Sequence, residues 1–138
     1  MPQRDLFHQT VRTALEREGW LVTHDPLPLR FGARRLFVDL GAEAPIAAEK
    51  GGRKIAVEVK SFLGDSDMRE LEQALGQYAL YRFLLDRDDP ARALFLAVAS
   101  EVFGRLFDDA DGRDLVATQR VRLLVFDVEK GVVTRWIE

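Results

Sequence analysis

Residues 55–60 read Ile-Ala-Val-Glu-Val-Lys, and this run constrains the fold more than any other part of the sequence. A branched apolar side chain occupies every second position, and a period of two predicts a β-strand with one apolar face. On such a strand Glu58 and Lys60 lie side by side on the other face. The sequence therefore predicts a strand that contributes a carboxylate and an amine to one polar surface.

A second strand-like run, Leu-Phe-Val-Asp-Leu at 36–40, contains Asp39. An Asp on one strand and a Glu-x-Lys on a nearby strand can hold a hard metal ion beside a fixed cation. Mg²⁺ uses few protein carboxylates, keeps several waters and binds phosphate oxygens. Such an ion activates water and stabilises charge during phosphodiester cleavage, and a Lys beside it adds electrostatic stabilisation. Asp39, Glu58 and Lys60 are therefore candidate catalytic residues, with Mn²⁺ as a possible substitute for Mg²⁺.

Composition narrows the class of protein. The chain has 138 residues, of which 47% are hydrophobic and 31% charged, and this is typical of one soluble globular domain. It contains no Cys, which excludes disulfides and thiolate metal sites. No apolar segment approaches the roughly 20 residues needed to span a bilayer, and no signal peptide is visible. We therefore expect a cytoplasmic protein without membrane contact.

The charge distribution gives a mixed indication. A net charge of −3 does not mark a nucleic-acid binder, and the acidic excess of residues 61–138 favours a protein partner. Basic residues nevertheless gather around the Asp39 and Glu58 segments, where they could face phosphate groups. The alternative is that they are ordinary solvated strand ends and turn residues. The residues concerned are Arg30, Arg34, Arg35, Lys50, Arg53, Lys54 and Lys60.

Hydrophobic periodicity predicts an α/β domain over residues 1–138 with a mixed central β-sheet flanked by helices. Pro26 and Pro28 should end the first strand, because proline removes a ladder donor. Gly51-Gly52 is a hairpin signal, and Asp67 with Glu70 resembles a capping box. The expected elements are a helix at 5–18, strands at 20–22, 34–40, 46–49 and 53–60, a helix at 67–87, a strand at 93–99, a short helix at 101–108, a turn at 109–112, and strands at 121–127 and 132–137.

Several strings along the chain resemble the XisH family, the proteins named fdxN-element excision controlling factors. The resemblance extends over essentially the whole length, and the strings at 46–64 and 73–78 are its most specific parts. The matching strings are Asp5-Leu-Phe-His-Gln, Glu18-Gly-Trp, Phe37-Val-Asp-Leu, Ile46-Ala-Ala-Glu-Lys-Gly, Ile55-Ala-Val-Glu-Val-Lys-Ser-Phe-Leu-Gly, Gln73-Ala-Leu-Gly-Gln-Tyr and Arg135-Trp-Ile.

The resemblance implies a restriction-endonuclease-like core of the PD-(D/E)XK superfamily. In that pattern a metal-binding Asp precedes a Glu-x-Lys, and Asp39, Glu58 and Lys60 match it residue by residue. Val38 replaces the usual Pro before the Asp. The implied metal ligands are Asp39, Glu58 and the main-chain carbonyl of Val59. A helix bearing Gln follows the Lys strand in such nucleases, which implies a role for Gln73 at a metal-bound water or the phosphate.

Two functions follow from the resemblance. The first is a Mg²⁺-dependent DNA endonuclease that acts in the excision of a DNA element. The second is a non-catalytic accessory protein that binds an XisI-type partner, with or without DNA, and directs a separate recombinase. The chain contains no recognisable serine- or tyrosine-recombinase constellation, so it is not expected to be the recombinase itself. A homo-oligomer is also possible.

Each candidate site residue on a predicted strand or helix also has a purely structural interpretation. Asp39 could pair with Arg34 or Lys60, since burying an unpaired carboxylate is costly. Glu58 and Lys60 could form an exposed ion pair, which contributes little to stability. His8 lies where related junction resolvases carry a metal-proximal Glu, yet a lone His on an apolar helix is more often a packed or capping residue.

The remaining candidates are polar side chains near the predicted site. Gln73 and Gln77 are four residues apart and share a helix face, but they could simply be polar positions on a half-buried helix. Glu43 and Glu49 are carboxylates close in sequence to Asp39 that could assist or replace it.

Overall fold

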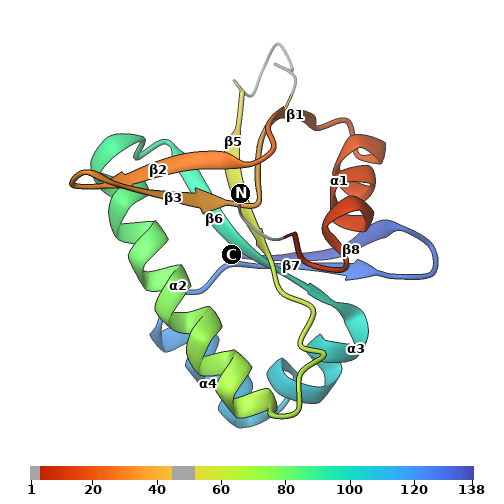
Figure 1. Cartoon of the computed structure of the whole chain (residues 1–138). Coiled ribbons are helices and arrows are strands. Elements are labelled where there is room, and N and C mark those ends of the chain that lie inside the picture. Colours follow the sequence, from red (N-terminus) through yellow and green to blue (C-terminus); the bar gives the residue numbers. More distant parts are fainter. Residues whose placement is uncertain (1–3, 45–51) are drawn as a thin grey trace.

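The computed structural model describes residues 4–44 and 52–138, and a six-stranded mixed sheet forms its centre (Figure 1). The strand order is β1-β4-β5-β6-β7-β8, and β2 pairs with β3 in a separate two-stranded sheet. The elements are α1 (His8–Arg17), β1 (Leu21–His24), β2 (Leu27–Phe31), β3 (Arg34–Val38), β4 (Leu40–Glu43), β5 (Lys54–Val59), α2 (Asp67–Asp88), β6 (Arg92–Ala99), α3 (Ser100–Val102), the π-helical turn η1 (Phe103–Phe107), α4 (Ala110–Thr118), β7 (Leu123–Asp127) and β8 (Val132–Ile137).

The predicted fold class is confirmed at this level: a mixed sheet lies among helices. Strand β5 pairs antiparallel with β4 and parallel with β6, so it is a central strand. Ile55, Ala56 and Val57 are fully buried. Because both faces of β5 are covered, Glu58 lies on a protein-lined face rather than on an open surface. None of the described helices is long and apolar enough to cross a membrane.

Helix α2 covers the face of the sheet that carries Glu58. Its buried side chains follow the three- and four-residue spacing of an amphipathic helix. Tyr78 donates to the carbonyl oxygen of Leu94 at 2.8 Å and accepts from the amide of Arg122 at 3.0 Å, which fixes the helix against β6 and the start of β7. The helix begins at Asp67 as predicted, but its cap lies one residue before the predicted one, because the Ser66 hydroxyl accepts from the Arg69 amide.

Strand β1 ends at His24, before Pro26, as predicted, but the next strand was missed and the one after it was predicted wrongly. Residues 27–31 form β2 although Pro28 lies within them, and this is tolerated because β2 belongs to a two-stranded sheet in which each strand has an unpaired edge. The single strand predicted at 34–40 is two strands, β3 and β4, which belong to different sheets and meet at Asp39. The predicted strand at 46–49 and the Gly51 side of the hairpin signal lie outside the described residues.

The prediction of a turn at 109–112 was also wrong. The Asp109 side chain accepts from the Gly112 amide at 2.8 Å, which is a local turn contact, but here it caps α4. The short helix expected at 101–108 is a single α-turn followed by η1. An added Cβ at Gly112 would lie 2.4 Å from the carbonyl oxygen of Leu106 and 2.6 Å from the Cα of Phe107, so α4 packs backbone to backbone on η1.

This close packing leads to a prediction about stability. Gly112→Ala should lower the free energy of unfolding by about 1–3 kcal/mol, because overpacking against backbone cannot be relieved by a rotamer change. Gly76→Ala is the matched control. Gly76 lies inside α2 with nothing within 4 Å of an added Cβ, and its replacement should stabilise by about 0.5–1 kcal/mol. Urea unfolding of both variants checks the pair, and equal effects would contradict the packing argument.

Candidate functional site

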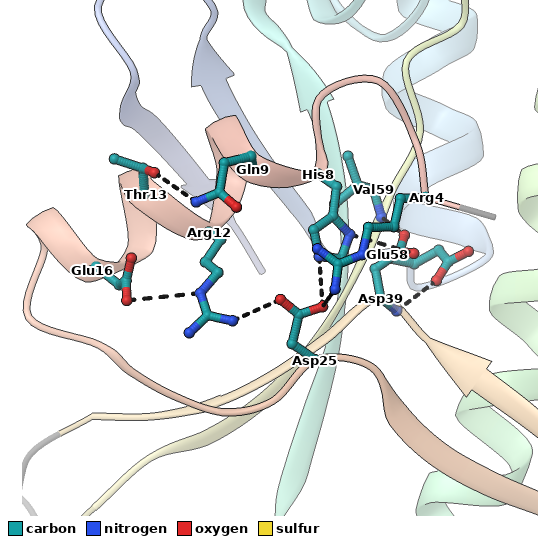
Figure 2. Close-up of polar contacts among 10 residues, drawn as sticks. All are labelled: Arg4, His8, Gln9, Arg12, Thr13, Glu16, Asp25, Asp39, Glu58 and Val59. Carbon is teal, nitrogen blue, oxygen red and sulfur yellow. Dashed lines mark hydrogen bonds and ion pairs between the residues drawn. The ribbon is translucent and has the colours of Figure 1, made fainter. Parts of the chain in front are cut away.

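Asp39 occupies the junction at which the chain leaves the two-stranded sheet and enters the central one. It follows Val38 of β3 and precedes Leu40 of β4, and Leu40 lies opposite Val57 in the register of β4 with β5. This register brings Asp39 to the end of β5, beside Glu58 (Figure 2). The break between β3 and β4 therefore positions the carboxylate that the sequence pattern had placed within a continuous strand.

Asp39 and Glu58 hold each other through main-chain groups. The Asp39 amide donates to Glu58 Oε1 at 3.2 Å, and the Val59 amide donates to Asp39 Oδ2 at 2.7 Å. Because the Asp39 amide lies 3.2 Å from Glu58 Oε1, the two carboxyl groups also lie close together. Such a separation is well within the limit of about 8 Å beyond which one Mg²⁺ could not reach both groups at its short oxygen distances.

Burial and mutual repulsion set the charge of this carboxyl pair. Burial, followed by the negative charge of Asp39, raises the pKa of Glu58 to about 9, although Lys60 opposes the shift. Burial also raises the pKa of Asp39, against the hydrogen bond from Val59 and the nearby His8 ring. At neutral pH Glu58 is therefore protonated and able to donate to Asp39. Perturbed carboxyl pairs of this kind are common at functional sites.

His8 lies between Asp39 and a second carboxylate. Its Nδ1 is 3.9 Å from Asp39 Oδ1, and its Nε2 is 2.7 Å from Asp25 Oδ1 (Figure 2). Arg12 donates to the other oxygen of Asp25 at 2.7 Å, and Arg4 approaches Asp25 at 3.3 Å. Burial alone would raise the pKa of Asp25, but the Arg12 hydrogen bond and the His8 ring lower it. His8 is thus buried and held in place beside the carboxyl pair.

Two further residues, which the sequence did not indicate as part of the site, lie near the carboxyl pair. Asp5 accepts from the Phe7 amide at 2.9 Å and from the Ser61 amide at 3.0 Å, and its charge raises the pKa of Asp39. Tyr81 of α2 is buried, and burial together with the charges of Glu58 and Asp39 raises its pKa to about 12. Asp5 belongs to the string Asp5-Leu-Phe-His-Gln, but no spacing rule links it to a residue 56 positions away.

The structure does not bring Glu43 to the carboxyl pair. Glu43 lies opposite Lys54, at the other end of β5 from Glu58, and approaches Arg92 at 3.9 Å. Gln73 is exposed and lines a shallow hollow at the start of α2. Gln77 is half-buried, and its Oε1 has no hydrogen-bond partner within the described segments. Glu49 lies outside the described residues.

The oxygen atoms around the carboxyl pair decide whether the site suits the predicted metal ion. Residues 4–44 and 52–138 contain no group of three or more His, Cys, Asp or Glu that could hold a metal ion. The pair offers two carboxylates, with the main-chain carbonyl of Val59 as a further oxygen. Mg²⁺ commonly binds through only one or two carboxylates and retains waters, so oxygen donors of this number suit it. Mg²⁺ binding at Asp39, Glu58 and Val59 stays a prediction.

Comparison with known proteins shows which protein family this chain resembles in sequence and structure. The sequence profile of the family described as XisH protein matches residues 1–134. A crystal structure of an XisH family protein from Nostoc punctiforme is 40% identical, with a TM-score of 0.86, and the match covers 97% of this chain and 100% of that one. A crystal structure of an fdxN element excision controlling factor protein from Anabaena variabilis is also 40% identical with a TM-score of 0.86, and covers 98% and 100%. No curated protein matches significantly.

The family profile and the two solved structures agree over nearly the whole length of the chain. The resemblance read from the sequence strings is therefore confirmed, and the chain belongs to the XisH family of excision controlling factors.

Proposed function

We propose that this protein is a Mg²⁺-dependent DNA endonuclease of the PD-(D/E)XK type that acts in the excision of a DNA element. The observation that carries the proposal is the direct contact of Asp39 with Glu58 at the end of β5. Lys60 follows Glu58 by two residues, and its positive charge lowers the pKa of Glu58, so it lies within electrostatic reach of the pair. A solved relative described as an excision controlling factor supports the biological setting.

In this proposal each residue of the site has a distinct role. Asp39, Glu58 and the Val59 carbonyl hold the ion, and the hydrogen bond from the Val59 amide to Asp39 orients the first carboxylate. When bound, Mg²⁺ or Mn²⁺ would lower the pKa of a bound water molecule and neutralise negative charge at the phosphate. Lys60 stabilises the negative charge that develops on the scissile phosphate. Gln73 contacts the phosphate or a water from the exposed side of α2.

His8 has a supporting role in this proposal. Its ring is buried and its Nε2 is fixed by Asp25, so it holds a polar group against Asp39 without contacting solvent. We assign His8 as a positioning residue that limits the rotation of the Asp39 carboxylate. The charge network of Arg12 and Arg4 around Asp25 keeps this arrangement in place.

A direct nuclease assay tests the proposal. Purified protein is incubated with linear, supercoiled and branched DNA in Mg²⁺ or Mn²⁺, with and without an XisI-type partner, and the products are resolved on gels. Cleavage of at least one DNA form, dependent on the divalent ion and lost in Asp39→Ala, is the expected result. Absence of cleavage under all of these conditions would overturn the endonuclease proposal.

A second function is favoured by a specific observation. Each carboxyl group of the pair accepts a main-chain hydrogen bond without any ion, and the described residues form no group of three or more acidic or His ligands. The pair could then serve only to join β3, β4 and β5. In this alternative the protein is a non-catalytic accessory that binds an XisI-type partner and directs a separate recombinase. It predicts no cleavage of DNA and excision activity in cells that survives Lys60→Ala.

A further inference from the structure

The hairpin formed by β2 and β3 carries positive charge without any internal compensation. Residues 27–38, here called the basic hairpin, contain Arg30, Arg34 and Arg35 and no Asp or Glu. All three side chains are exposed. Within the described ranges, none of the three takes part in an ion pair. The basic hairpin is therefore an exposed concentration of cations on a protein whose net charge is negative.

The register of the hairpin makes this concentration unfavourable for folding. Arg30 lies directly opposite Arg35, and Phe31 lies opposite Arg34. Like charges directly opposite each other on an antiparallel pair are destabilising. Stability alone gives no reason for this pairing, so the cost indicates that an anion outside the chain faces these side chains.

The two faces of the hairpin have different surroundings. Leu27 and Leu29 are buried, while the alternate residues Pro28 and Arg30 are exposed. The hairpin lies across the C-terminal end of α2 (Figure 1), where Arg87 donates to the carbonyl oxygen of Arg30 at 3.0 Å. One face is thus anchored to the protein, and the outer face, which carries Arg30 and Arg35, is open.

The outer face leads directly to the carboxyl pair. Arg35 stacks over the ring of Phe37 at 5.9 Å, and Asp39 follows Phe37 by two residues, immediately after the end of β3. At about 3.3 Å per residue of extended chain, Arg35 and Asp39 are at most about 13 Å apart. One strand of duplex DNA advances about 3.4 Å along the axis per nucleotide, so this distance corresponds to about four nucleotides.

We infer that the outer face of the basic hairpin binds the sugar–phosphate backbone of DNA and directs it toward the carboxyl pair. The inference takes DNA as substrate from the proposed function, but it concerns binding and does not require cleavage. Guanidinium groups match phosphate geometry through paired N–H donors, and Arg30 and Arg35 on the outer face supply sequence-independent contacts. An acidic protein surface fits less well, because the strand that carries Arg35 leads to the carboxyl pair for which phosphodiester cleavage is proposed.

Salt-dependent DNA binding tests this inference. Fluorescence anisotropy with a labelled duplex is measured in EDTA, so that cleavage does not interfere, between about 50 and 200 mM salt. The hairpin variant R30Q/R34Q/R35Q should bind at least about tenfold more weakly, and the slope of log K against log salt should fall by about two to three. The single variant Arg35→Gln should lower the slope by about one and covers the case in which the triple variant fails to fold.

A matched control separates the hairpin from net charge. R113Q/R120Q/R135Q removes three exposed arginines around α4 and β8 and changes the net charge equally. It should leave the slope within about 0.5 of the wild-type value. Equal losses in both triple variants, no loss in the hairpin variant, or no DNA binding by the wild type would each overturn the inference. Binding of only an acidic protein partner, lost in the hairpin variant, would overturn it as well.

The outcomes also separate this inference from the endonuclease proposal. If the wild type binds DNA through the hairpin and never cleaves it, the hairpin inference stands and the endonuclease proposal fails. If the wild type cleaves DNA and the hairpin variant binds and cleaves equally well, the endonuclease proposal stands and the hairpin inference fails.

Discussion

Lys60→Ala should reduce the rate of DNA cleavage by about 10²–10³-fold, the loss that follows removal of a preorganised electrostatic stabiliser. Lys60 lies immediately after β5, and its amide donates to the carbonyl oxygen of Ala97 at 3.1 Å. This main-chain contact survives truncation of the side chain, so the backbone near Glu58 should keep its position. Single-turnover cleavage with saturating Mn²⁺ measures the effect on the chemical step alone.

Metal binding distinguishes this effect from general damage to the site. Lys60→Ala should bind Mn²⁺ with nearly wild-type affinity, whereas Asp39→Ala should lose both metal binding and cleavage. Lys130→Ala is the matched control, because Lys130 is exposed in the turn between β7 and β8 and carries the same charge. Cleavage by Lys60→Ala at the wild-type rate would remove Lys60 from the mechanism and would favour the accessory function.

The central part of the fold was predictable because it depends on local patterns. The alternation over residues 55–60 indicated β5, and the spacing of apolar side chains over 67–87 indicated α2 to within one residue of its observed end. The order of strands in the sheet was not predictable in this way, because β5 pairs with β4 and β6 through contacts between distant parts of the chain.

The break at Asp39 shows why the strand prediction failed in one place. Val38 and Leu40 are both buried, so the apolar pattern continues unchanged across the junction between the two sheets. Only the change of pairing partner, from β2 to β5, marks the end of one strand and the start of the next. A period of two reports which side chains are buried and carries no information about which sheet buries them.

The candidate site was predictable in its carboxyl pair and not in the residues around it. Asp39 and Glu58 were linked by strand alternation and by the family resemblance. Asp25 was not predicted as part of the site, because it follows a short strand and lies beside two prolines. It contacts His8 only because α1 packs on the sheet in the folded protein. Tyr81 looked like one of several apolar positions on α2, and only the folded structure reveals the charges that it approaches.

Glu58→Gln should make the protein without metal more stable at pH 8, by at least about 1 kcal/mol, or about 3 °C in Tm. The pKa of Glu58 is about 9 in the folded protein against an ordinary value of 4.5. Between these values the folded state holds a proton that the unfolded state has released, so the stability of the wild type falls as pH rises. The slope is at most about 1.4 kcal/mol per pH unit. Glutamine retains an oxygen for the Asp39 amide and does not titrate.

The pH series and divalent ions together make this prediction specific. The advantage of Glu58→Gln should shrink toward pH 5, because below 4.5 the wild-type carboxyl is protonated in both states. Millimolar Mg²⁺ or Mn²⁺ should raise the Tm of the wild type by displacing the Glu58 proton and binding the folded state, and should leave Glu58→Gln unchanged. Glu129→Gln, which removes an exposed carboxylate in the turn between β7 and β8, controls for net charge. A Tm difference between wild type and Glu58→Gln that is constant from pH 5 to 8 would contradict the raised pKa. Equal stabilisation of both proteins by the ions would place any bound metal away from the carboxyl pair.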